Sequence, residues 1–133
     1  MLAIPSLSHA LAGAALLLVI ATPAMAQEKT CLLEGDFKIG AQRVLISDCA
    51  ENRTMPPAEF REACKGMSEF TLAGETYTAK LSFSAACPPN PQATCEGIFG
   101  GAMNARYYKR DAKLLEDTRK SCLAQGGKWS SPR

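Results

Sequence analysis

Six cysteines are the residues of this chain best suited to chemistry, and they stand at Cys31, Cys49, Cys64, Cys87, Cys95 and Cys122. Redox-active thiols and zinc sites both favour a Cys-x-x-Cys spacing, which no two of these cysteines have. The only histidine, His9, lies near the start of the chain, so none follows to complete a zinc site or to act as a general base. The even count therefore predicts three structural disulfides, with neither a metal nor another cofactor.

Local spacing favours one of the fifteen pairings that six cysteines allow. Cys87 and Cys95 enclose a segment with three prolines, whose bends should bring its ends together. Cys49 and Cys64 are separated by one short loop and part of a predicted helix, so we expect them to form a second bridge. Cys31 then pairs with Cys122 and ties the start of the domain to its last helix.

Carboxylates offer the remaining general acid-base chemistry, because two Asp or Glu residues can hydrolyse a glycosidic bond without histidine. Glu59 and Glu62 stand one turn apart on a predicted helix, whereas Glu96 and Asp111 flank a glycine-rich segment. Glutamates on a helix surface are usually solvated. A carboxylate-dependent hydrolase acting on cell-wall glycan is therefore the alternative function and not the favoured one.

The glycine-rich segment, residues 97–101, could suggest a phosphate cradle. It lacks the Lys-Ser/Thr pair of a P-loop and the dinucleotide-binding fingerprint. Glycines at this density more often mark a turn or a place where backbone passes closely, and we expect that here.

Basic and aromatic residues are densest in the run from Arg106 to Arg110. If this run is a strand, Arg106, Tyr108 and Arg110 share one face and Tyr107 points to the other. Two guanidinium groups flanking a ring could bind an anionic group or stack on a sugar. These three residues form the candidate binding site, although a charged strand face that discourages edge pairing is the simpler interpretation.

The elements that would position these residues are short strands and two helices. Residues 76–85 alternate between apolar and polar side chains, which predicts a half-buried strand with Phe83 in the core. Residues 69–72 precede it across Ala73-Gly74 and predict a hairpin. Residues 37–39, 43–47 and 102–109 are further predicted strands, and residues 48–53 are expected to be a polar loop.

Helix signals complete the fold class. Pro56-Pro57 favours the start of a first helix, Asp111 is a suitable N-cap for a second, and Gly126-Gly127 would end it. The predicted class is α+β: a small antiparallel sheet with two helices, stapled by three disulfides.

The first residues are typical of a secretory leader. Residues 2–26 contain no Lys, Arg, Asp or Glu and end at Ala24-Met25-Ala26, the small-x-small pattern that signal peptidase cuts. The apolar centre, residues 11–21, is shorter than the roughly 20 residues that span a bilayer. We therefore predict a signal peptide over residues 1–26 and one domain over residues 27–133. The mature protein would be periplasmic or secreted, where disulfides persist, without stable membrane insertion.

A formal net charge of +2 predicts no strong attraction to nucleic acid. The expected function is that of a small exported, non-catalytic protein that binds or inhibits a partner or supports the envelope. The expected partner is an envelope protein, or an anionic or glycan ligand. A thiol-redox protein is the least favoured alternative.

Overall fold

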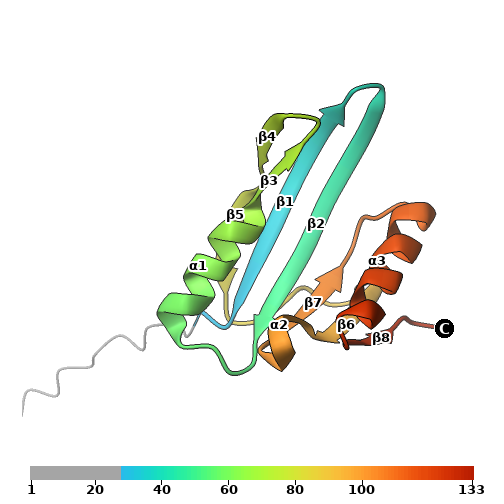
Figure 1. The fold of residues 1–133 in the computed structure, drawn as a ribbon. Helices are drawn as coiled ribbons and strands as arrows, with labels where there is room; N and C mark the ends of the chain where they lie inside the picture. Colours follow the sequence, from blue (N-terminus) through green and yellow to red (C-terminus); the bar gives the residue numbers. More distant parts are fainter. Residues whose placement is uncertain (1–27) are drawn as a thin grey trace, which may run out of the picture.

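Six antiparallel strands form the main sheet, in the order β5-β1-β2-β7-β6-β8, and a separate hairpin joins β3 to β4 (Figure 1). The computed structural model describes residues 28–133, and the predicted signal peptide lies outside them. The elements are β1 (Thr30–Ile39), β2 (Gln42–Asn52), α1 (Pro57–Ser68), β3 (Glu69–Leu72), β4 (Glu75–Thr78), β5 (Lys80–Ser84), β6 (Ala93–Gly97), α2 (Ile98–Gly101), β7 (Met103–Tyr107), α3 (Ala112–Ala124) and β8 (Lys128–Ser130). The predicted α+β class, with an antiparallel sheet, two helices and three disulfides, is confirmed. Within residues 28–133, no helix has the length and apolar character needed to cross a membrane.

The long β1–β2 hairpin contains the two longest strands of the sheet, and it turns at Gly40 and Ala41. The sequence placed two strands here correctly but made them too short, and the polar loop predicted over residues 48–53 is wrong. Both strands continue, so that Thr30 pairs with Glu51 at their far end. The inner half of β2 lies between β1 and β7. Backbone pairing on both sides therefore outweighs the polar composition of these residues.

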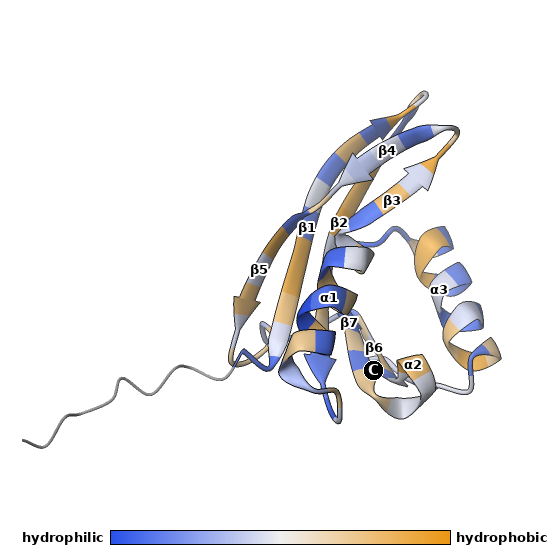
Figure 2. Ribbon diagram, turned by 60° about the vertical axis from the view of Figure 1, so that its left-hand side comes forward, coloured by the Kyte–Doolittle hydropathy of each residue, from blue (hydrophilic) through white to orange (hydrophobic). Residues whose placement is uncertain are grey.

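The two faces of the sheet differ in what covers them. Residues opposite each other in antiparallel strands point to the same side, and this places Cys31, Ala50 and Met103 together against α1. We call this side the helical face, and the other side, which carries Cys49 and Arg106, the open face. Phe60 of α1 is 1% exposed and sits in the core on the helical face. Figure 2 shows the apolar stretches along β1 and β2 that supply part of this core.

The alternating segment 76–85 forms two strands and not one. β4 pairs with β3 as predicted, whereas β5 pairs with β1, and buried Ala79 separates them. The Ala79 N–H donates to the Ser68 carbonyl at 2.8 Å, which redirects the chain between the two pairings. The alternation is still visible in exposure, because Tyr77, Leu81 and Phe83 are half-buried while their polar neighbours are exposed. The predicted hairpin is confirmed.

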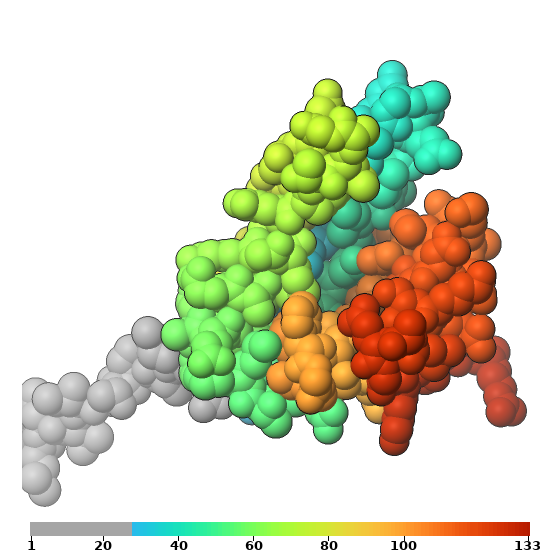
Figure 3. Space-filling model, viewed as in Figure 1, coloured from blue at the N-terminus to red at the C-terminus, as the bar shows by residue number. Residues whose placement is uncertain are grey.

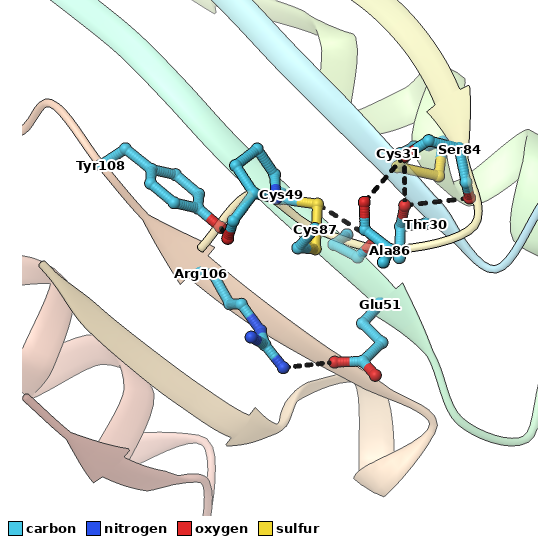
Figure 4. The surroundings of a disulfide bond; sticks show 12 residues. Thr30, Cys31, Cys49, Glu51, Ser84, Ala86, Cys87, Arg106 and Tyr108 are labelled. Atoms are coloured by element: carbon cyan, nitrogen blue, oxygen red, sulfur yellow. Dashed lines mark hydrogen bonds and ion pairs between the residues drawn. A yellow bond between two sulfur atoms is a disulfide. The ribbon is translucent and has the colours of Figure 1, made fainter. Parts of the chain in front are cut away.

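Residues 85–92, here called the crossing segment, connect two strands that are far apart. β5 and β6 are four strand positions apart, about 19 Å at the usual strand spacing. Eight residues reach about 26–29 Å when fully extended, so the segment spans this distance even though Asn90 bends it with a φ of +58°. It passes over the open face, where Cys87 bonds to Cys49 and the Tyr108 hydroxyl donates to the Pro88 carbonyl at 2.7 Å (Figure 4).

All six cysteines form disulfides, as predicted, but the predicted partners are wrong. The bonds join Cys31 to Cys64, Cys49 to Cys87 and Cys95 to Cys122. The segment after Cys87 crosses from the open face to β6, so Cys87 and Cys95 end on opposite faces and the predicted Cys87–Cys95 bridge does not form. Cys95 faces the helical side, whereas Cys87 bonds on the open face.

The other two predicted bridges fail for similar reasons. Cys49 points to the open face, but Cys64 lies on α1 across the sheet, which excludes Cys49–Cys64. Cys31 and Cys122 belong to opposite ends of the helical face, because Cys122 bonds to β6 and β6 lies three strand positions from β1.

Helix α3 begins as the sequence predicted. The Asp111 carboxylate accepts a hydrogen bond from the Leu114 N–H at 2.8 Å, which is an N-cap. After α3, the chain passes against a disulfide, because a Cβ on Gly127 would lie 2.8 Å from the Cys95 sulfur and 2.9 Å from that of Cys122. Only glycine fits there, and the chain then enters β8, which pairs with β6.

Candidate functional site

The three predicted binding residues do not share one face. Strand β7 ends at Tyr107, so the alternation that would have aligned Arg110 with Arg106 stops before reaching it. Arg106 and Tyr108 lie on the open face (Figure 4), whereas the Arg110 side chain lies on the helical face, beside α3. The geometric premise of the predicted site is therefore wrong.

On the open face, Arg106 and Tyr108 contact the protein itself. The Arg106 guanidinium donates to Glu51 at 2.9 Å, and both side chains are about one-third exposed. Its buried Nε has no hydrogen-bond partner among residues 28–133. Burial raises the pKa of Tyr108, whose hydroxyl holds the crossing segment through Pro88. These contacts point to a role in holding the open face together.

Arg110 forms a largely buried ion pair on the helical face. Its guanidinium contacts Asp48 at 2.5 Å and the Thr118 hydroxyl at 2.7 Å, and it lies 4.5 Å from the centre of the Tyr107 ring. Tyr107 in turn stacks on Trp129. Burial raises the pKa of Asp48, and the charge of Arg110 offsets this only in part. Through Arg110, the pair links β2 to α3 and so stabilises the packing of this helix on the sheet.

The candidate catalytic carboxylates are dispersed over the fold. Glu59 and Glu62 lie exposed on α1, and Glu62 forms an ion pair with Lys65 at 2.8 Å. Asp111 caps α3, and Glu96 lies exposed on β6. In the part of the chain that the structure describes, no group of three His, Cys, Asp or Glu residues could hold a metal ion. Of these candidates, Glu59 and Glu62 share an element, and both are exposed on its surface.

Two cavities lie beside α3. One, of about 370 Å³, runs under the helix and is lined by Tyr107, Arg110 and Thr118 among others. The other, of about 400 Å³, lies between α2 and the turn from α3 into β8. Its lining includes Arg53, Glu96, Gly100, Gly101, Gln125 and Lys128. The sequence drew attention to the glycines and to Glu96, but it gave no sign that Arg53 and Lys128 would join them, because 74 positions separate those two residues.

A hollow opens on the helical face between the β3–β4 hairpin and α3, with β2 at its floor (Figure 3). Val44 and Ile46 of β2 point to this side, because they alternate in register with Asp48 and Ala50. Helix α1 packs mainly on β1, β3 and β5, and α3 packs mainly on β8. Val44 and Ile46 remain only half-buried.

Comparison with known proteins assigns no function to this site. No family model matches the chain, and neither a curated protein nor a solved structure is significantly similar to it.

Proposed function

We propose that this is an exported, non-catalytic binding protein that receives a partner of the envelope in the hollow on its helical face. The observation that carries the proposal is the floor of the hollow, where Val44 and Ile46 present apolar side chains that remain half-buried. Apolar side chains that are left partly exposed in a concave surface favour association with another molecule. We therefore choose a protein partner over the anionic or glycan ligand.

The three disulfides support two parts of this proposal. They support export, because such bonds persist in oxidising compartments. They also make one wall of the hollow rigid, since a bond fixes α3 to β6. A preformed surface loses less conformational entropy when it binds.

The alternatives receive less support. A thiol-redox protein needs accessible thiols, whereas all six cysteines are bonded and five of them are buried. A glycan hydrolase needs two carboxylates that converge on a cleft, whereas the one candidate pair on a single element, Glu59 and Glu62, is exposed on the surface of α1.

The test compares two adjacent residues of β2. Ile46→Lys places a charge on the floor of the hollow, and Leu45→Lys places the same charge on the open face, where Leu45 is 37% exposed. Both variants should fold, as urea denaturation would verify. In pull-downs from the protein's own envelope extract, Ile46→Lys should lose a partner that the wild type and Leu45→Lys retain. If the two variants capture the same proteins as the wild type, the hollow is not the binding surface.

A further inference from the structure

The cavity between α2 and the α3–β8 turn contains two cations from distant parts of the chain, Arg53 and Lys128. The backbone N–H groups of Arg53 and Thr54 both donate to the Ala102 carbonyl, at 2.9 and 3.3 Å, which ties this loop to the end of α2. Lys128 is held opposite Glu96 by the pairing of β8 with β6. Within residues 28–133, neither cationic side chain makes a hydrogen bond or an ion pair. Their charges are therefore available to a ligand.

Glycines keep one wall of this cavity free of side chains. Gly100 and Gly101 have φ angles of +66° and +92°, which side-chain-bearing residues rarely adopt. A Cβ built on either would meet nothing within 4 Å, so these positions face open space. Backbone N–H groups of the turn can thus come close to a bound group. The volume, about 400 Å³, lies within the range of small-molecule sites.

The cavity also contains a negatively charged group and a neutral hydrogen-bond acceptor. Glu96 lines the cavity and forms no ion pair with the described residues. The Gln125 side-chain nitrogen donates to the Ser121 hydroxyl at 3.1 Å, which leaves the Gln125 carbonyl oxygen as a second acceptor. A plain anion would be attracted by the cations but repelled by Glu96. A ligand that carries both charges would satisfy all three groups.

We propose that this cavity binds a small ligand with both a carboxylate and an ammonium group, of the amino-acid or short-peptide class. Arg53 and Lys128 hold the carboxylate, Arg53 with the forked geometry that guanidinium offers. Glu96 accepts from the ammonium group. Two cations against one carboxylate match a ligand with a net charge of −1, such as an acidic amino acid. The cavity lies apart from the hollow, so this inference does not rest on the proposed function.

The test uses two ligands that differ only in the ammonium group, L-glutamate and glutarate, titrated calorimetrically into the protein produced from its full chain. Arg53→Gln and Lys128→Gln should each weaken glutamate binding by about tenfold or more, since each removes a charge-assisted contact. Glu96→Gln should weaken glutamate binding and strengthen glutarate binding, because it removes attraction in one case and repulsion in the other. Lys38→Gln removes the same charge from an exposed site on β1 and is the matched control.

Three results would overturn the inference. The first is no saturable glutamate binding up to about 10 mM, an affinity too weak to be specific. The second is glutamate binding that Lys38→Gln weakens as much as Arg53→Gln and Lys128→Gln do. The third is a Glu96→Gln variant in which both ligands change in the same direction. Phosphate as a third ligand should bind more weakly than glutamate, and tighter binding of phosphate would exclude the ammonium contact.

Discussion

Removing the disulfide on the open face should destabilise the protein, and the length of the loop that this bond closes gives the size of the loss. The variant Cys49→Ala/Cys87→Ala opens a loop that spans 38 residues. The chain-entropy treatment of a loop this size gives about 4 kcal/mol of lost stability. Such a loss is a large part of the free energy of unfolding that a small domain has.

The matched variant is Cys31→Ala/Cys64→Ala, whose loop spans 33 residues. The entropic terms of the two loops differ by only about 0.1 kcal/mol, so any larger difference must come from packing. Cys31 and Cys64 are fully buried in the core, whereas Cys87 is only half-buried. Cys49 is buried as well, so the core variant truncates one more buried sulfur than the open-face variant and should lose about 1 kcal/mol more.

Urea denaturation of both unreduced variants measures the two losses, with thermal unfolding as the second measurement if either variant is too unstable. The crossing segment should also become sensitive to protease in Cys49→Ala/Cys87→Ala but not in the core variant. The reasoning would be refuted if the open-face variant lost less than about 1 kcal/mol or lost more than the core variant.

Three further predictions concern the core and the helical face. Burial raises the pKa of Asp48 above its usual value of about 4. The folded state therefore binds a proton at the Asp48 carboxylate more tightly than the unfolded chain does. The wild type should therefore lose stability relative to Asp48→Asn as the pH rises above about 4, and a relative gain in urea titrations would show that the ion pair dominates. Phe60→Ala should cost about 3–5 kcal/mol and Phe83→Ala clearly less, because Phe60 is buried and Phe83 only half-buried; equal losses would contradict the packing. Gly127→Ala should cost about 1–3 kcal/mol by overpacking a disulfide, whereas Gly66→Ala, in open space on α1, should stabilise by about 0.5–1 kcal/mol; thermal melts that rank them the other way would refute this.

Local signals in the sequence were sufficient for several elements of the fold. The alternation after Glu75 identified extended chain where β4 and β5 form, and Asp111 marked the start of α3, because period and capping depend on neighbouring residues only. Strand β6 was missed. Its residues follow three prolines and have no clear alternation, and its pairing is with β7 and β8, which the sequence places later.

The disulfide partners and the candidate sites depend on how distant segments of the chain are placed in the fold. The disulfide partners depend on which face of the sheet each cysteine occupies, and the strand order that sets the faces has no local signature. Arg110 was placed with Arg106 by extending the strand alternation beyond its end at Tyr107. The Arg53 and Lys128 cavity was not predicted because two chain segments meet there only after the sheet has assembled.

The alternation of side chains in the β1–β2 hairpin also bears on how the native disulfides are reached. Two of the native bonds interleave along the chain, since Cys49 lies between Cys31 and Cys64, and Cys64 lies between Cys49 and Cys87. Cys31 and Cys49 are the first two thiols of the chain and could pair wrongly if oxidation preceded folding. In the hairpin, Cys31 pairs with Ala50 and Leu32 with Cys49, so the two sulfurs are close along the strands but emerge on opposite sides of the sheet. Once formed, this hairpin excludes that wrong bond, and each of the two thiols faces the side of the sheet on which its native partner lies.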